Sequence, residues 1–223
     1  MSAVMYAVYG ASGCGRGVLP LARDALSSSG ESTENLVFVD DAVLGGRIPR
    51  AVNGHRVMSY DEYRRLDSPS KQIVLAIADS GVRAKLAARC SGDGIGFFEV
   101  RATNVVTMDD VEIGPGAILS PFVTLTSNVR IGRHFHANLY SYVEHDCVIG
   151  DFVTFAPGVQ CNGNIVVEDF AYIGAGAVIR QGRAGEPVVI GRGATVGMGA
   201  VVTRSVPAGE TVVGNPARPL RKS

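Results

Sequence analysis

A small or apolar residue recurs every six positions through most of the second half of the sequence. Counting from Val111 in steps of six gives twelve positions through residue 177, and eleven of them are apolar or small residues without a hydroxyl; the exception is Ser141. The period slips by five residues around positions 183–187 and resumes at Val188. A six-residue period sustained over this length predicts a parallel β-helix.

A longer period of eighteen residues is nested inside the first one. VEIG at 111–114 returns as VRIG at 129–132 and as CVIG at 147–150. Three six-residue units therefore make one triangular coil, and residues eighteen apart stack at roughly the 4.8 Å spacing of neighbouring strands. By this count His145 lies between Ser127 and Gly163, and the small neighbour at 163 leaves room beside the imidazole.

The first hundred residues follow a different pattern. Short apolar runs at 6–9, 35–39 and 73–77 predict strands, and the helical spacing at 18–26, 60–66 and 82–89 predicts helices between and after them. Alternating strands and helices, with a glycine turn at 10–15 after the first strand, indicate a small parallel sheet of Rossmann type. We expect an α/β domain over 1–102 followed by a β-helix domain over 103–223.

Charge and hydropathy exclude several classes of function. Lys and Arg together number 21, as do Asp and Glu, and the pI is near 6.9. This balance gives no reason to expect a nucleic-acid partner. No apolar run reaches the eighteen residues of a membrane span, and no export signal is evident, so we expect a soluble, cytoplasmic protein without membrane insertion. The four cysteines lack C-x-x-C spacing and are expected to be reduced.

The segment SYVEHDCVIG at 141–150 contains His145, the first candidate for chemistry in the repeat region. A general base needs a pKa near neutrality and a partner that fixes its tautomer, and an acid next to His145 can supply the latter. Spacing alone favours an ordinary surface histidine. His134, His136, His145 and Cys147 fall within fourteen residues, but Cys147 occupies a core position of the repeat, so we expect no metal site.

Two features of the first domain are candidates for ligand binding. The turn GASGCG at 10–15 suits close approach to a phosphate-bearing ligand, although it lacks a complete G-x-G-x-x-G. Cys14 is interpreted as a pocket residue, since no histidine is near it in sequence to activate the thiol. Asp40 and Asp41 end the second predicted strand, where an acid either binds a sugar hydroxyl or caps the following turn.

Taken together, these motifs resemble a known family. GASGCG at 10–15, VFVDD at 37–41, Asn138, SYVEHDCVIG at 141–150, CNGN at 161–164 and VGNPA at 213–217 are similar to the bacterial sugar O/N-acetyltransferases typified by the sialic acid, bacillosamine and perosamine enzymes. The similarity runs through nearly the whole chain, and EHDCVIG is its most specific part.

The resemblance implies a homotrimer of left-handed β-helices with its active site between subunits. It further implies a sugar-nucleotide-binding N-terminal domain, with acetyl-CoA as co-substrate and no metal. In such enzymes the histidine that matches His145 receives the proton from the attacking amine, and the acid that matches Asp146 raises its basicity. Many relatives have Glu where this chain has Asp146. The implied site residues fall into two groups. Those on the acetyl-CoA side are Thr154, Gly174, Ala175, Gly197 and Met198; those on the substrate side are Ser12, Gly13, Cys14, Asp40, Asp41, Ala78 and Asn138.

From this resemblance we expect an N-acetyltransferase that acts on the 4-amino group of a nucleotide-linked 4-amino-4,6-dideoxyhexose and serves the synthesis of surface polysaccharides such as O-antigen. Some relatives have His where Cys14 stands and Gly where Ala78 stands, and these departures favour GDP-perosamine over the bacillosamine type of substrate. The alternatives are O-acetylation of a sugar such as sialic acid and a non-catalytic sugar-nucleotide-binding trimer.

Overall fold

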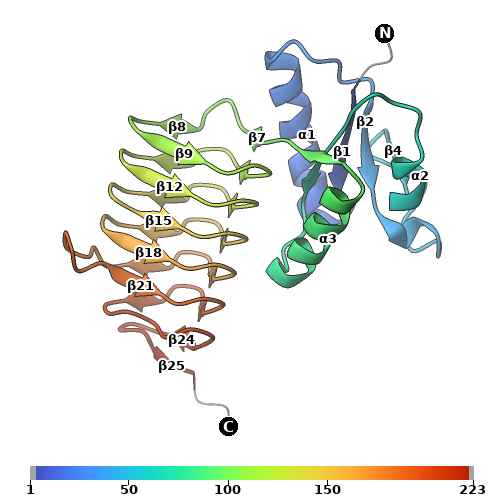
Figure 1. Cartoon of the computed structure of the whole chain (residues 1–223). Helices are drawn as coiled ribbons and strands as arrows, with labels where there is room; N and C mark the ends of the chain where they lie inside the picture. Colours follow the sequence, from blue (N-terminus) through green and yellow to red (C-terminus); the bar gives the residue numbers. More distant parts are fainter. Residues whose placement is uncertain (1–3, 221–223) are drawn as a thin grey trace. The chain divides into compact units, whose positions relative to one another are not determined.

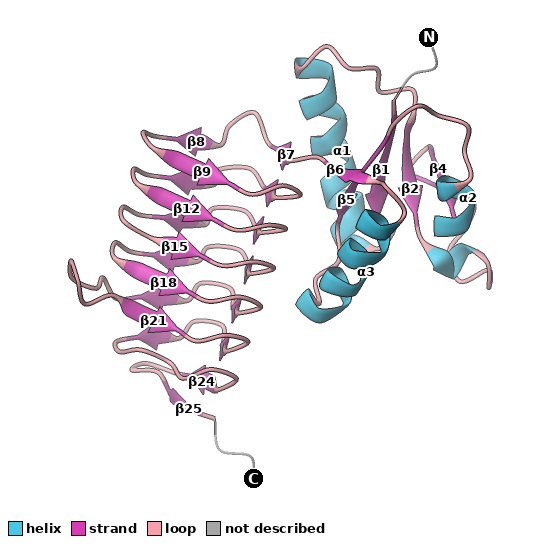
Figure 2. Cartoon of the chain, in the orientation of Figure 1, coloured by secondary structure: helices cyan, strands magenta, loops and turns pink. Residues whose placement is uncertain are grey.

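The computed structural model describes residues 4–220, and these divide into two compact units with the boundary between Thr103 and Asn104. Figure 1 follows the chain through both units, and Figure 2 distinguishes their helices and strands. This boundary lies a few residues before Val111, from which the six-residue period was counted. No helix among the described residues combines the length and the apolar character that a bilayer crossing requires.

The first unit is built on a six-stranded sheet in the order β3-β4-β2-β1-β5-β6. All its neighbouring strands are parallel except β3 and β4, which form a hairpin. Helix α1 packs against β1 and β2, and α3 packs against β5. The elements are β1 Met5–Tyr9, α1 Gly13–Ser28, β2 Leu36–Val39, the 3₁₀ helix Asp41–Val43, β3 Ala51–Val52, β4 His55–Met58, α2 Tyr60–Arg64, β5 Lys71–Leu75, α3 Ser80–Gly92, β6 Gly96–Phe97 and β7 Val100–Arg101.

This strand order confirms the Rossmann-type sheet and places a ligand crevice. Strand β1 has β2 on one side and β5 on the other. The chain passes from β1 to β2 in one direction across the sheet and from β5 to β6 in the opposite direction. Open α/β sheets bind ligands at this kind of switch point. Two details of the sequence prediction are wrong. The sequence does not predict the hairpin of β3 and β4, because β3 has only two residues and β4 only four. Helix α1 already begins at Gly13, inside the segment interpreted as a turn.

The second unit is a parallel β-helix with three strands per coil, which together form three ladders. The β8 ladder contains β8 Val106–Thr107, β11 Thr124–Leu125, β14 Tyr142–Val143, β17 Gln160–Cys161, β20 Val178–Ile179 and β23 Val201–Val202. The β9 ladder contains β9 Val111–Ile113, β12 Val129–Ile131, β15 Val148–Ile149, β18 Ile165–Val167 and β21 Val188–Ile190. The β10 ladder contains β10 Ile118–Leu119, β13 His136–Ala137, β16 Thr154–Phe155, β19 Tyr172–Ile173, β22 Thr195–Val196 and β24 Thr211–Val213. The last strand, β25 Arg218–Pro219, pairs antiparallel with β24.

The register of the coils confirms both sequence periods. Val129 pairs with Val111, eighteen residues earlier, whereas Ile165 pairs with Val188, twenty-three residues later. The additional five residues belong to a hairpin in which Arg183 and Glu186 pair antiparallel. Core positions of the six-residue repeat such as Phe135 and Cys147 are fully buried in one continuous core, so the repeat specifies the interior of the prism.

Candidate active site

His145 lies on the corner between β14 and β15, held by hydrogen bonds to the coils on either side. The amide of Asn164 donates to the carbonyl oxygen of His145 at 2.9 Å, and the amide of Asp146 donates to that of Ser127 at 3.2 Å. Asp146 has a φ of 58°, in the left-handed region that Asn and Asp tolerate better than most residues. In a regular strand, consecutive side chains point to opposite faces. The bend at Asp146 ends this alternation, so the side chains of His145 and Asp146 can contact each other.

His145 and Asp146 form a direct pair. Nδ1 of the imidazole lies 2.8 Å from Oδ2 of the carboxylate, and Oδ1 accepts a hydrogen bond from the side-chain amide of Asn128 at 3.2 Å. The hydrogen bond with His145 lowers the pKa of Asp146 below its ordinary value, with a smaller contribution from Asn128. A carboxylate on Nδ1 selects the tautomer that carries its proton there, which leaves Nε2 as a hydrogen-bond acceptor.

One face of the imidazole of His145 lies against Gly163. A Cβ atom on residue 163 would lie 2.5 Å from Nε2 of His145, so the ring occupies the space that any larger side chain would take. About 44% of the His145 side chain remains exposed to solvent. The pair therefore presents a partly exposed imidazole of defined orientation at a corner of the coil.

Four of the residues expected on the acetyl-CoA side lie at a different corner of the prism. Gly174 and Ala175 follow β19, and Gly197 and Met198 follow β22, at the same corner of the next coil. The amide of Gly199 donates to the carbonyl oxygen of Ala175 at 2.8 Å, and a Cβ on Gly174 would lie 2.6 Å from the amide nitrogen of Met198. The amides of Gly174 and Gly197 donate to the neighbouring coil. Those of Ala175 and Met198 have no partner within residues 4–220.

Two other residues of the second unit that were expected in the site, Thr154 and Asn138, have contacts within the coil. Thr154 is buried in β16. The side-chain amide of Asn138 donates to the carbonyl oxygen of Phe155 at 2.7 Å and links two coils. Cys147 lies in the core, as expected, behind the corner that carries His145. No group of three His, Cys, Asp or Glu side chains suited to a metal ion occurs in the described part of the chain.

In the first unit the substrate-side residues converge on the carboxyl ends of β1, β2 and β5. Ser12 is the N-cap of α1, and Gly13 and Cys14 form its first turn. A Cβ on Gly15 would overlap the carbonyl oxygen of Gly10, so this turn requires glycine. Burial raises the pKa of the Cys14 thiol, which agrees with a pocket residue rather than a nucleophile.

The two acids that follow β2 both accept hydrogen bonds from the protein. Asp40 accepts from the amides of Ala42 and Ala11, each at 3.0 Å, so it caps the 3₁₀ helix and ties β2 to the glycine turn. Asp41 accepts from the amide of Tyr60 at 2.8 Å and from the hydroxyl of Tyr9 at 3.1 Å. Of the two interpretations left open by the sequence, capping is therefore observed for Asp40.

Comparison with known proteins identifies this arrangement. No family model matches the chain. It is, however, 47% identical over 219 residues to the GDP-perosamine N-acetyltransferase of Escherichia coli O157:H7, covering 98% of this chain and 97% of that one. The chain belongs to the hexapeptide-repeat sugar acetyltransferases. Its coil is accordingly the left-handed parallel β-helix of that family.

Solved structures of the acetyltransferase family show the same fold. WeeI from Acinetobacter baumannii AYE is 54% identical and superposes with a TM-score of 0.92, covering 97% of this chain and all of that one. The acetyltransferase domain of PglB from Neisseria gonorrhoeae FA1090, solved in complex with acetyl coenzyme A, is 28% identical with a TM-score of 0.83, covering 99% of this chain and all of that one.

Two residues of this acetyltransferase, Asn128 and Arg83, make side-chain hydrogen bonds near the candidate sites that were not predicted from the sequence. Asn128 orients Asp146 from the preceding coil, and the eighteen-residue count from Asp146 could have found it. Arg83 is fully buried in α3 and donates to the carbonyl oxygens of Ile77 and Ala78 at 2.7 and 3.3 Å. Burial lowers the pKa of its guanidinium to about 10. Its position in the sequence was that of an ordinary helix-surface arginine.

Proposed function

We propose that this protein transfers acetyl from acetyl-CoA to the 4-amino group of GDP-perosamine. The observation that carries the proposal is the His145–Asp146 pair, whose free Nε2 can accept a proton while the carboxylate stabilises the imidazolium that forms. The near full-length relative from Escherichia coli bears the name of this activity. The reaction requires acetyl-CoA and a nucleotide sugar, so we place it in the cytoplasm.

In the proposed reaction the neutral 4-amino nitrogen attacks the thioester carbonyl. The tetrahedral intermediate carries a negative oxygen, and the amides of Ala175 and Met198 are suited to donate to it because they are not used within the coil. Nε2 of His145 takes the proton released by the nitrogen. The C–S bond then breaks, and the proton passes from the imidazolium to the leaving thiolate of CoA.

The geometry also supports a homotrimer. In a single chain His145 lies on the corner between β14 and β15, whereas Ala175 follows β19 and Met198 follows β22, on another corner of the prism. One chain therefore does not bring the base and the acyl site together, and packing of adjacent prisms would. Apolar side chains are exposed on the coil, including a stacked pair of Phe122 and Tyr140 that are 51% and 64% exposed and a Met198 that is 82% exposed. Burial in an interface would remove these surfaces from water.

The nucleotide sugar would bind the first unit at the switch point of its sheet. Ser12, Gly13 and Cys14 line the start of α1, where backbone amides and the helix dipole favour a diphosphate. Ala78 follows β5 on the other side of β1. Asp40 would act by shaping the glycine turn through its bond to Ala11.

The direct test is acetyl transfer by the purified protein with GDP-, UDP- and dTDP-linked 4-amino sugars. We expect saturable release of CoA thiol with GDP-perosamine and loss of one free amine per thiol released. Thiol release with sialic acid instead would favour O-acetylation, and failure with every amino-sugar nucleotide would favour a non-catalytic binding protein. Analytical ultracentrifugation of the same sample tests the trimer.

A further inference from the structure

A hairpin of residues 181–187 interrupts the regular coil and is not used by the proposed reaction. The amide of Arg183 donates to the carbonyl oxygen of Glu186 at 3.0 Å, and the reciprocal bond measures 2.9 Å. Gly185 turns the tip with a φ of 77°. In Figure 1 the hairpin projects from the corner at which the chain enters β21.

The hairpin lies on the same corner of the coil as His145. The amide of Gly182 donates to the carbonyl oxygen of Gly163 at 3.0 Å, and that of Asn164 donates to the carbonyl oxygen of His145 at 2.9 Å. Gly163 is the residue over which the imidazole lies. The base of the hairpin is therefore two coils from His145, which is about 10 Å at the spacing of neighbouring strands.

A cavity of about 240 Å³ lies between the hairpin and the coil, and its walls suit an anion. Arg180, Gln181, Arg183 and Thr203 line it together with one acid, Glu186. Arg133 and Arg192, elsewhere on the coil, are each paired with an aspartate. Within residues 4–220 the exposed guanidinium groups of Arg180 and Arg183 form no ion pair. Two free guanidinium groups against one acid leave the cavity positively charged, and guanidinium groups bind phosphate in a fork geometry.

We propose that Arg180 and Arg183 bind the phosphate groups of acetyl-CoA, which adds a subsite to the proposed function and rests on it. The pantetheine arm has twelve bonds between its sulfur and its first phosphate oxygen, as many as four residues of extended chain, so it spans about 14 Å. A thioester at His145 therefore places the phosphates within reach of side chains that project from the hairpin.

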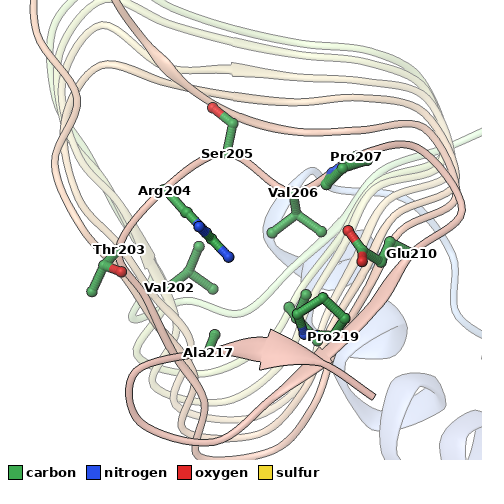
Figure 3. A pocket seen from close by; sticks show the side chains of 10 residues that line it. Val202, Thr203, Arg204, Ser205, Val206, Pro207, Glu210, Ala217 and Pro219 are labelled. Atoms are coloured by element: carbon green, nitrogen blue, oxygen red, sulfur yellow. The ribbon is translucent and has the colours of Figure 1, made fainter. Parts of the chain in front are cut away.

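The test compares Arg180→Ala, Arg183→Ala and the double variant with Arg204→Ala as a matched control. Arg204 extends over another hollow, of about 360 Å³, at the C-terminal end of the coil, beside Val202 and Val206 (Figure 3); Thr203 alone lines both this hollow and the cavity of Arg180 and Arg183. Each single variant should raise the KM for acetyl-CoA about tenfold, the effect of losing one charge-assisted hydrogen bond. The KM for the nucleotide sugar and all parameters of Arg204→Ala should stay at wild-type values.

Acetyl-pantetheine, which has no phosphate, separates this subsite from other roles of the hairpin. Wild type and the double variant should use it equally well. Equal KM values for acetyl-CoA in wild type and the double variant would overturn the inference, as would a defect that persists with acetyl-pantetheine or appears in the KM for the nucleotide sugar. Calorimetric titration of wild type with acetyl-CoA keeps the two proposals distinguishable: absence of binding contradicts the proposed function, whereas equal binding by wild type and the double variant contradicts only the subsite.

Discussion

The imidazole of His145 lies directly over the backbone of Gly163 in the next coil, where a Cβ would come within 2.5 Å of Nε2. Gly163 does not have a positive φ, so alanine fits the backbone but not the space. We expect Gly163→Ala to displace the ring and reduce kcat by about 100-fold, because misplacement by about 1 Å has effects of that size.

Gly92→Ala is the control for this substitution, since a Cβ there meets nothing within 4 Å. Steady-state kinetics and thermal unfolding should be measured on both variants. Full activity of Gly163→Ala would show that the position of the ring over this glycine is not required.

The relation between His145 and Gly163 also shows how far the sequence could predict the site. The eighteen-residue period is local and repetitive, so it placed these residues in adjacent coils correctly. The small residue at 163 predicted free space beside the imidazole of His145. In the structure the imidazole itself fills the space that a Cβ of residue 163 would take. The left-handed bend at Asp146 was not evident, because the rule of alternating strand faces does not apply at a corner of the coil.

The first unit was harder to predict in detail because its contacts are not repetitive. The glycines at 10–15 predicted a turn. In the structure the last three of these residues already belong to α1, whose first turn packs against the backbone of Gly10. The bond from Ala11 to Asp40 joins residues 29 apart, and no spacing rule identifies such a pair. Arg83 is buried although arginine is usually exposed.

Asp146→Asn should alter the pH dependence of catalysis. The hydrogen bond with His145 depresses the pKa of Asp146, so the carboxylate is ionised throughout the neutral range and stabilises a protonated imidazole. Without this charge, the imidazolium that forms when His145 accepts a proton is less stable. The acidic limb of the kcat/KM profile should therefore move to lower pH while maximal turnover falls. Superimposable profiles for wild type and variant would make Asp146 a purely structural residue.

Asp40→Asn should weaken binding of the nucleotide sugar. The substitution removes one of the two carboxylate oxygens that accept from Ala11 and Ala42, which frees the glycine turn from β2. We expect about a tenfold higher KM for the nucleotide sugar, with the KM for acetyl-CoA unchanged. A lower melting temperature with an unchanged KM for the sugar would limit Asp40 to capping.

Glu62 should contribute to stability in a pH-dependent way. The amide of Ser59, and to a lesser degree Arg50, lowers the pKa of Glu62 to about 2, and Ser59 and Glu62 form a capping box on α2. A depressed folded-state pKa gives stability that is present above the unfolded value of about 4.3 and lost as the pH falls towards 2. The difference in melting temperature between wild type and Glu62→Gln should therefore shrink as the pH falls below about 4. A difference independent of pH would contradict this assignment.

The most direct test of the catalytic account is single-turnover acetyl transfer by His145→Ala, measured across the pH range with saturating acetyl-CoA and GDP-perosamine. The account predicts a rate reduced by roughly 10²- to 10⁴-fold, with acetyl-CoA binding retained because the acyl subsite lies on another corner of the coil. A near-normal rate at every pH would contradict the role of His145 as the proton acceptor.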